Sequence, residues 1–405
     1  MTCRACGAST EQFLSLGMQP LPNRFLTEVQ LADPEPRYPL DLSFCPGCCL
    51  VQLGAVVPPG DLFSHYLFTS STSASTRQHF SNLAAYLKRN FGGSPGSPLP
   101  LKVVDIASND GIMLRAWRSM GVQAIGIEPA GNLCRLAWDD GLETLNEFFT
   151  RETVDRLGPE SAHVVTACNV LAHVSELTEF AANVRRLLRP DGVFVAEVQY
   201  FRDTIEKLSF DNCYLEHVFY FTLGSLERVL ANAGLFVFAA ERVDTHGGSL
   251  RVYANTRELN WGGPNPLHLR HEEAKLGLDR LETYQEFAKK VERAGRQLRE
   301  RLLAIKADGK RIVGYGAAAK STTVLTYCGI GPETVNYIVD DSPLKVDLFT
   351  PGTHIPVVGP EELEQSRPDV ILVLAWNFLA DIKAKTSHLG AEYIIPVETP
   401  ERSRS

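Results

Sequence analysis

Val103-Val-Asp-Ile-Ala-Ser-Asn-Asp-Gly111 has the pattern of a buried strand that ends in a tight turn and opens into a helix. Small residues at such a turn let a ligand approach the backbone, and an acidic residue that ends the next strand can bind ribose hydroxyls. Glu128, in Ile125-Gly-Ile-Glu-Pro129, is that acid and lies 23 positions after Asp105. The stretch therefore predicts a nucleotide-type cofactor site in an α/β sheet.

The spacing from Asp105 to Glu128 fits sheets that bind NAD and sheets that bind S-adenosylmethionine. Two features favour S-adenosylmethionine: the first strand contains an acidic residue, and the turn lacks the G-x-G-x-x-G pattern that suits a pyrophosphate. Ala107 and Asn109 stand where methyltransferases usually have glycine, so a packing turn without a ligand remains the alternative. The predicted cofactor-binding residues are Asp105, Ala107, Ser108, Asn109, Gly111, Glu128, Pro129 and Cys168.

Strands and helices alternate beyond this stretch, which is typical of a parallel α/β sheet. Strands are expected at 102–106, 124–128, 163–167 and 192–197, after a helix at about 76–90. A charged amphipathic segment at about 271–305 predicts a long helix with at most one break. Further strands at 311–315, 335–339 and 370–374 predict a second α/β unit. Connectors at 92–100 and 261–266 help to divide the chain into 1–78, 79–263 and 264–405.

The composition is that of a soluble globular protein, with 405 residues, 44% of them hydrophobic and 22% charged. The longest apolar run, Val370 to Trp376, is far shorter than the ~18 residues that span a bilayer. The first residues have no apolar signal region, so we expect a cytoplasmic protein. The net charge of −8 disfavours binding to nucleic acid.

Cys3 and Cys6 form one C-x-x-C pair, and Cys45 and Cys48 form another. Neither pair has the strand and helix of a redox motif, and together they supply four thiolates for tetrahedral Zn²⁺, with unmetallated thiols as the alternative. Four protein ligands leave no open position, so the predicted zinc is structural. The 38 residues between Cys6 and Cys45 are expected to form one connecting loop. Buried thiols are expected at Cys49, Cys134, Cys168, Cys213 and Cys328.

Two polar clusters follow within the sheet region. Asn169 and His173 are spaced i and i+4, so on a helix they would share one face; a capping asparagine and a hydrogen-bonded histidine are the equal alternative. Tyr214, Glu216 and His217 form a candidate acid/base set, because an imidazole near a carboxylate or phenol can accept a proton near neutral pH. Side chains alternate along a flat strand, so the segment must bend if all three serve one site.

The C-terminal unit has its own strand, turn and helix around Gly314-Tyr-Gly316. Backbone N–H groups at a helix start, together with an ammonium group, suit a diphosphate, and an acid at the end of the next strand suits a ribose. A duplicated domain kept only for packing is the alternative. The predicted substrate-binding residues are Tyr315, Lys320, Ser321, Asp340 and Lys345, and Trp376 and Asn377 could line the same cleft.

The combination and order of these motifs resemble those of the S-adenosylmethionine-dependent nucleotide-sugar C-methyltransferases, which install branched methyl groups on antibiotic deoxysugars. The resemblance rests partly on the cysteine pairs, the Asp105 turn and a serine run that begins with the aromatic Tyr66. It rests also on four further motifs: Asn169-Val-Leu-Ala-His173, Tyr214-Leu-Glu-His217, Gly314-Tyr-Gly-Ala-Ala-Ala-Lys320 and Pro351-Gly-Thr-His-Ile-Pro356. It implies a zinc-binding module, a class I (Rossmann-like) methyltransferase domain, and a C-terminal α/β domain that helps to hold a nucleotide diphosphate.

The resemblance also implies roles for individual residues. His217 is the general base with Tyr214 and Glu216 beside it, and the sugar pocket is completed by Tyr66, Asn169 and His173. Leu215 replaces the first histidine of the family's Tyr-His-Glu-His motif. In the C-terminal motif, Ala318 and Ser321 stand where the family commonly has proline and glycine.

Carbon methylation requires a carbanion, and a hexose becomes a carbon acid only next to a ketone. The expected substrate is therefore a dTDP-4-keto-deoxysugar, methylated at C3 or C5 after a base removes the α-proton. One rival is a zinc-containing methyltransferase acting on RNA, which the negative charge disfavours. The other is a nonmethylating NAD-dependent nucleotide-sugar protein, which would leave the Tyr-Glu-His cluster without a role.

Overall fold

The computed structural model describes residues 1–63, 69–92, 100–245, 247–257 and 263–397. Tyr66 lies outside the described residues, as do residues 93–99 of the first predicted connector and 261–262 of the second. Within the described part, no helix is both long and apolar enough to cross a membrane.

The central domain contains a seven-stranded sheet with the order β10-β11-β8-β7-β4-β5-β6. β11 pairs antiparallel with both neighbours, whereas the pairs from β8 to β6 are parallel. The four strands expected here are confirmed. Their bounds are β4 (Val103–Ile106), β5 (Ala124–Ile127), β6 (Thr144–Leu145), β7 (Ala162–Cys168), β8 (Leu188–Gln199), β10 (Phe236–Val243) and β11 (Ser249–Asn255).

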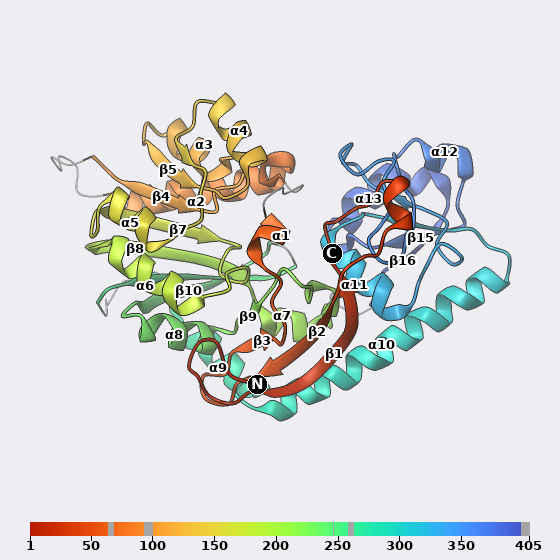
Figure 1. The fold of residues 1–405 in the computed structure, drawn as a ribbon, viewed down its shortest axis with the longest axis horizontal. Coiled ribbons are helices and arrows are strands. Elements are labelled where there is room, and N and C mark those ends of the chain that lie inside the picture. The colour runs from red at the N-terminus through yellow and green to blue at the C-terminus, as the bar shows by residue number, and fades with distance from the viewer. Residues whose placement is uncertain (64–68, 93–99, 246, 258–262, 398–405) are drawn as a thin grey trace.

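Helices cover both faces of this sheet (Figure 1). One face packs against α2 (Ala74–Phe91), α3 (Ile112–Ser119) and α4 (Gly131–Asp139). The other packs against α5 (Arg151–Leu157), α6 (Leu177–Leu187) and α8 (Leu223–Asn232). The strand order changes direction between β4 and β7, and ligands of open α/β sheets bind at the carboxyl ends of strands at such a switch point. The predicted cofactor turn follows β4, so it lies at this position.

The N-terminal module corrects one expectation. The residues between Cys6 and Cys45 are not a single loop, because they contain the antiparallel strands β1 (Glu11–Pro20) and β2 (Arg37–Phe44). With β3 (Val51–Leu53) and β9 (Phe219–Tyr220) these strands form a four-stranded sheet. Alternate residues such as Leu14, Leu16, Leu40 and Leu42 are buried, and they pack in a core that the module shares with the C-terminal part of the chain.

The C-terminal unit is the second α/β domain that the sequence predicts. Its five-stranded sheet has the order β14-β13-β12-β15-β16, and every pair is parallel. The strands are β12 (Ile312–Tyr315), β13 (Ile338–Val339), β14 (Val357–Val358), β15 (Val370–Val373) and β16 (Glu392–Ile394). The helices packed on it include α11 (Ala319–Cys328), α12 (Glu362–Ser366) and α13 (Leu379–Thr386).

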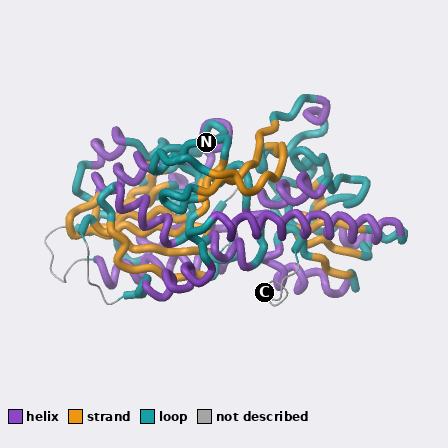
Figure 2. Tube along the Cα trace, turned by 90° about the horizontal axis from the view of Figure 1, so that it is seen from below, coloured by secondary structure: helices purple, strands orange, loops and turns teal. Residues whose placement is uncertain are grey.

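The predicted long helix has its single break. α9 (Leu267–Leu276) ends at Gly277, whose φ of +67° is left-handed, and α10 (Leu281–Ala307) follows. α10 packs against β1, α11 and β12, and it runs along the underside of the molecule (Figures 1 and 2). The helix therefore joins the N-terminal hairpin to the C-terminal sheet.

Candidate active site

The segment that bears the predicted base is bent, as its use in one site requires. It lies between the 3₁₀ turn η3 (Phe210–Asn212) and strand β9. The backbone N–H of His217 donates to the carbonyl of Tyr214 at 2.9 Å, which closes a β-turn over Tyr214-Leu-Glu-His217. The first and fourth side chains of this turn meet, because the Tyr214 hydroxyl lies 2.9 Å from His217 Nε2.

These contacts define the tautomer of His217. Its Nδ1 lies 3.1 Å from the carbonyl oxygen of Asn212, and a carbonyl only accepts hydrogen bonds. Nδ1 therefore holds a proton, and in the neutral ring the lone pair of Nε2 accepts from the Tyr214 hydroxyl. Burial and the negative charge of Glu216 raise the pKa of Tyr214 well above its usual value, so the phenol remains a neutral donor.

Glu216 and Leu215, the middle residues of the turn, contact other parts of the molecule. The buried carboxylate of Glu216 accepts from Asn23 Nδ2 of the N-terminal module at 2.6 Å. Leu215 packs in the core that the N-terminal and C-terminal parts share. The residue that departs from the family motif is thus a core side chain in this structure.

His173 lies next to His217, but Asn169 and His173 do not share a helix. Asn169 has a left-handed φ of +58°, and the backbone N–H of His173 donates to Val170 in a turn. This turn places the His173 ring 4.8 Å from the His217 ring, centroid to centroid, in an edge-to-face arrangement. Burial lowers the pKa of His173 to about 4, so it is neutral near pH 7. The expected common helix face is therefore wrong, although one of the two residues, His173, contacts His217.

The cofactor turn adopts the backbone that glycine would favour. Ala107 and Asn109 both have φ of +53°, in the left-handed region. The backbone N–H of Asn109 donates to Glu128 Oε2 at 2.9 Å, and that of Ala130 donates to Oε1 at 2.8 Å. These hydrogen bonds offset part of the free-energy cost of left-handed backbone conformations, which residues with a Cβ rarely adopt. The acid predicted to bind ribose thus also holds the turn.

Asp105 lies beneath this turn and is buried. Thr166 Oγ1 donates to its Oδ1 at 2.5 Å. Burial raises the pKa of Asp105 to about 7. The hydrogen bond from Thr166 lowers this pKa, and the negative charge of Glu128 raises it further. Cys168, at the end of β7, is half-buried. Among the other predicted cofactor residues, Ser108 is buried, Gly111 has a left-handed φ of +85°, and Pro129 accepts a hydrogen bond from Asn146 through its carbonyl.

The serine run packs on the cofactor turn. The backbone N–H of Ser70 donates to Asn109 Oδ1 at 2.9 Å, and the Ser71 hydroxyl donates to Asp110. The stretch that follows Tyr66 in the chain is therefore in contact with the predicted cofactor site.

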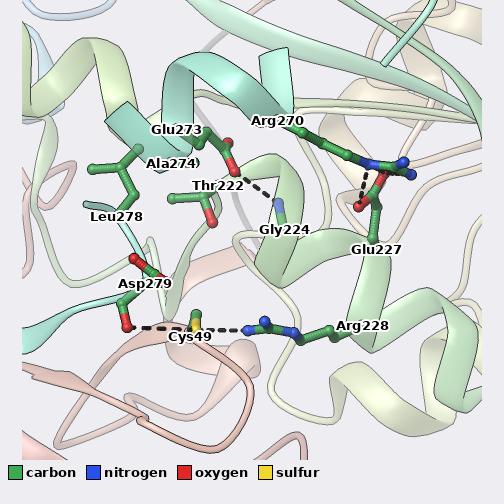
Figure 3. Close-up of a pocket in the computed structure, with 10 residues that line it drawn as sticks. All are labelled: Cys49, Thr222, Gly224, Glu227, Arg228, Arg270, Glu273, Ala274, Leu278 and Asp279. Carbon is green, nitrogen blue, oxygen red and sulfur yellow. Dashed lines mark hydrogen bonds and ion pairs between the residues drawn. The ribbon is translucent and has the colours of Figure 1, made fainter. Parts of the chain in front are cut away.

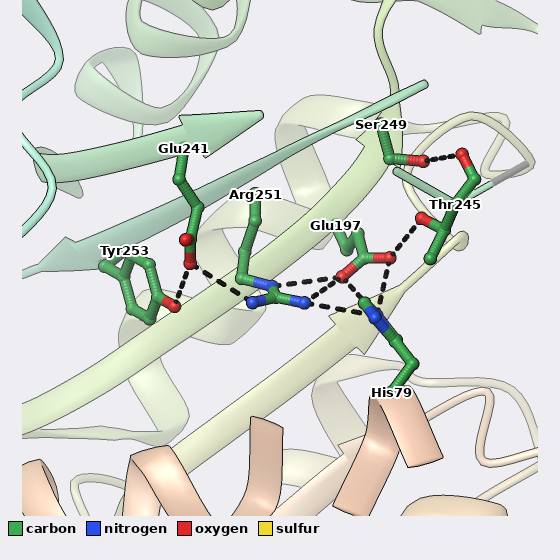
Figure 4. Close-up of polar contacts among 7 residues, drawn as sticks. All are labelled: His79, Glu197, Glu241, Thr245, Ser249, Arg251 and Tyr253. Carbon is green, nitrogen blue, oxygen red and sulfur yellow. Dashed lines mark hydrogen bonds and ion pairs between the residues drawn. The ribbon is translucent and has the colours of Figure 1, made fainter. Parts of the chain in front are cut away.

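A charged cluster beside the site was not identified in the sequence (Figure 4). The carboxylate of Glu197, near the end of β8, accepts from Arg251 of β11 at 2.9 and 3.0 Å. His79 of α2 lies 3.0 Å from the same carboxylate, and Thr245 donates to it. Despite burial, the hydrogen bond from His79 and the charge of Arg251 lower the pKa of Glu197 to about 2. The backbone carbonyl of Glu197 also accepts from Asn169 N–H at 2.7 Å, so the cluster supports the site.

Replacing Glu197 with glutamine should lower the free energy of unfolding by about 3 kcal/mol, because Arg251 would keep a buried charge without its main partner. Glu241→Gln is the matched control. Glu241 binds the same guanidinium at 3.1 Å from a side chain that is 32% exposed, so its loss should cost at most about 1 kcal/mol. Urea unfolding near pH 7 measures both variants. Equal destabilisation by the two would contradict this ranking.

The predicted substrate residues of the C-terminal unit form two groups. Asp340 accepts from the backbone N–H of Ala317 at 2.7 Å and lies 3.4 Å from the Lys345 ammonium. Glu128 accepts in the same way from the backbone of the cofactor turn. In both α/β units, therefore, an acid at the end of one strand binds the turn that follows the preceding strand in the chain. Tyr315 donates to Asp341 at 2.9 Å, and buried Ser321 donates to the Ala318 carbonyl.

Lys320 belongs to the second group. Its ammonium donates to Asn377 Oδ1 at 2.6 Å and lies 4.1 Å from the centroid of the Trp376 ring. The structure thus brings Lys320 together with the two residues that the sequence associated with the same cleft.

The four predicted zinc ligands converge. Their sulfur atoms all lie within 4.8 Å of one another, with 3.6 Å between Cys3 and Cys48 and 3.5 Å between Cys6 and Cys45. A tetrahedral ion with Zn–S bonds of about 2.3 Å would separate its sulfurs by about 3.8 Å, so the set fits zinc. Of the other cysteines, Cys49, Cys134, Cys213 and Cys328 are buried as expected, and Cys168 is half-buried.

A cavity of about 270 Å³ lies elsewhere, between the N-terminal module, α8 and α9 (Figure 3). Arg228 Nη1 donates to Cys49 Sγ there at 2.6 Å, and Arg270 pairs with Glu227. None of the predicted site residues that the structure describes lines this cavity.

Models of known protein families support the same three-part organisation. Family models match for a zinc binding domain at residues 3–63, a methyltransferase domain at 75–239 and a C-methyltransferase C-terminal domain at 244–398. Among solved structures, the PH0226 protein of Pyrococcus horikoshii OT3 aligns with 47% of this chain and 95% of its own, with 16% identity and a TM-score of 0.38.

Two curated relatives are methyltransferases. The ubiquinone biosynthesis O-methyltransferase of Methylobacterium nodulans is 30% identical over 115 residues, which cover 27% of this chain and 46% of that protein. C-methyltransferase NovU of Streptomyces niveus is 33% identical over 405 residues, which cover 98% of this chain and 96% of NovU. The similarity to NovU extends over nearly the whole of both proteins, and two of the three parts match a methyltransferase domain and a C-methyltransferase C-terminal domain. This chain therefore belongs to the C-methyltransferase family.

Proposed function

We propose that the protein transfers a methyl group from S-adenosylmethionine to the carbon next to the ketone of a dTDP-4-keto-deoxysugar. The observation that supports this most strongly is the pair formed by Tyr214 and His217, because a neutral imidazole whose Nδ1 donates to a carbonyl has its lone pair on Nε2. Methyl transfer to oxygen or nitrogen needs no carbon base, whereas methylation of carbon next to a ketone needs one.

His217 Nε2 accepts the α-proton, and the electron pair of the broken C–H bond forms the enolate. The Tyr214 hydroxyl must leave Nε2 for this to happen, and as a neutral phenol it is then a donor suited to the enolate oxygen. Bound S-adenosylmethionine supplies an electrophilic methyl group, which the nucleophilic carbon takes as S-adenosylhomocysteine departs. The hydrogen bond from His217 Nδ1 to Asn212 keeps the proton off Nε2 before each turnover.

The other groups hold the reactants. The cofactor turn and Glu128 would bind S-adenosylmethionine, with Asn169 and Cys168 at its methyl end, while Tyr66, Asn169 and His173 would line the sugar pocket. In the C-terminal unit, the nucleotide diphosphate would lie against Tyr315, Lys320, Ser321, Asp340 and Lys345. Zn²⁺ at Cys3, Cys6, Cys45 and Cys48 would stabilise the module that contacts Glu216 through Asn23.

The direct test incubates the protein with methyl-labelled S-adenosylmethionine and a dTDP-4-keto-6-deoxyhexose. We expect a new C–CH₃ group at C3 or C5 in the NMR spectrum of the product. Calorimetric titration with NAD(H) and labelling of bulk RNA cover the two rival functions. Tight NAD(H) binding without S-adenosylmethionine binding, or label in RNA alone, would reject the proposal.

Glu128→Ala should weaken S-adenosylmethionine binding by about 1.5–3 kcal/mol, or roughly 10- to 150-fold, the range for a lost hydrogen bond to a charged group. Glu143→Ala, an exposed acid nearby, should leave the affinity unchanged. Because Glu128 also holds the turn, thermal unfolding of both variants should accompany the calorimetry. A folded Glu128→Ala variant with wild-type affinity would rule out the ribose contact.

A further inference from the structure

Trp376 connects the C-terminal unit to the segment that contains the base. It lies in the 3₁₀ turn η4 (Trp376–Phe378), just after β15. Its indole Nε1–H donates to Asp211 Oδ2 of the methyltransferase domain at 2.5 Å. Both residues are almost fully buried, with exposed fractions of 3% and 1%, so the bond is shielded from water.

Contacts from both domains fix the position of this indole ring. On the methyltransferase side, Gly247 lies so close that a Cβ there would stand 2.5 Å from the ring, and its φ of +89° also favours glycine. On the C-terminal side, the Lys320 ammonium lies 4.1 Å from the ring centroid. The donor can therefore shift little relative to Asp211.

Asp211 is connected to His217 through one residue, Asn212. It lies in η3 and is bonded to Asn212, whose carbonyl accepts from His217 Nδ1. A displacement of Asp211 would move that carbonyl and thus the group that fixes the tautomer of His217. Thr323 of α11 gives a second tie to this segment, since its hydroxyl donates to the carbonyl of Cys213 at 2.9 Å. Figure 1 shows α11 between the two large sheets.

We propose that Trp376 is a positioning residue for carbon deprotonation: through Asp211 and Asn212 it holds His217 in the tautomer whose Nε2 is a base. This inference rests on the proposed function, because it assigns His217 that role. It also gives the C-terminal unit a part beyond nucleotide binding. Lys320, which would bind the diphosphate, contacts the same indole, so nucleotide binding and base orientation share one side chain.

The kinetic test is a double-mutant cycle on Trp376→Phe and Asp211→Ala, assayed with a dTDP-4-keto-6-deoxyhexose. Trp376→Phe keeps an aromatic side chain but removes the N–H donor together with part of the indole ring, whereas Asp211→Ala removes the acceptor and leaves the indole intact. A displacement of catalytic groups by ~1 Å can cost ~10²-fold, so each single variant should lower kcat by roughly 10- to 100-fold and leave both KM values within about twofold. The double variant should lose little more than either single one.

Asp211→Asn keeps an acceptor oxygen and should retain kcat within a few fold, and Trp138→Phe is the matched tryptophan control. Trp138 is half exposed and donates to the Thr144 carbonyl, away from the base. Additive losses in the double variant, or a loss confined to KM, would overturn the positioning role. If Trp376→Phe fails to fold, the comparison of Asp211→Asn with Asp211→Ala decides the question.

Amide hydrogen exchange tests the same connection without any substrate. The N–H groups of His217 and Val218, bonded to Tyr214 and Ala172, should exchange faster in Trp376→Phe and at the wild-type rate in Trp138→Phe. Unchanged exchange in Trp376→Phe would reject the connection, whatever the assay shows. If Trp376→Phe exchanges faster but the wild-type protein methylates no keto sugar, the proposed function is refuted. The structural connection between Trp376 and the segment of His217 would still hold.

Discussion

His217→Asn should slow methylation by about 10²- to 10⁴-fold, the usual contribution of a general base. Asparagine has no group of suitable pKa, but its amide N–H can still donate to the carbonyl of Asn212, so the turn should keep its shape. Both ligands should therefore bind as in the wild type, and the loss should fall on kcat.

The deprotonation step can be measured without methyl transfer. With S-adenosylhomocysteine in place of the methyl donor, the wild-type protein in D₂O should exchange the α-hydrogen of a dTDP-4-keto-6-deoxyhexose, and His217→Asn should exchange it slowly. His268→Asn, an exposed histidine on α9, is the matched control and should exchange at the wild-type rate. Exchange at the wild-type rate in His217→Asn would move the base to another group, with His173 as the next candidate.

Tyr214→Phe separates the two members of the pair. If the phenol donates to the enolate oxygen, its removal should slow exchange even though Nε2 then no longer accepts the hydrogen bond from Tyr214. If Tyr214 only blocks Nε2 in the resting protein, exchange should become faster.

The sequence predicted the elements whose signal is local. The strands of the central sheet and the long helix with one break follow from periodicity. The two C-x-x-C pairs define their site by spacing. The hairpin of β1 and β2 also had a local signal, since Leu40-Asp-Leu-Ser-Phe44 alternates with period two. The two flanking C-x-x-C pairs indicate a connecting loop instead, because their spacing carries no information on the residues between them.

The remaining features depend on residues that are far apart in the chain. Asn23 meets Glu216 across 193 positions, and Trp376 meets Asp211 across 165, so neither pair shares a motif. The misplaced helix at Asn169 has a different cause. A spacing of i and i+4 indicates a shared face only if the backbone is helical, and the left-handed φ of Asn169 begins a turn instead.

Cys45→Ser should remove stoichiometric Zn²⁺ and destabilise the N-terminal module. Structural zinc sites contribute on the order of 10 kcal/mol or more of apparent binding free energy at neutral pH, and serine is a far poorer ligand than thiolate. The buried leucines of β1 and β2 give the module some stability without metal, so we expect partial rather than complete unfolding. Metal analysis and thermal unfolding measure the two effects, with Cys49→Ser, the adjacent cysteine outside the four-sulfur cluster, as the control.

Loss of zinc should also affect the turn that contains His217, although no zinc ligand lies near this turn in the sequence. β9 completes the module's sheet and begins two residues after His217, and Asn23 of the module binds the carboxylate of Glu216. When the module loosens, both restraints on the turn weaken, so kcat should fall in Cys45→Ser. The affinity for S-adenosylmethionine, which would bind at the turn after β4, should stay unchanged. A purified wild type without zinc, together with a Cys45→Ser variant that folds normally, would refute the metal site. A variant that loses zinc and keeps full kcat would show instead that the base turn is held without the module.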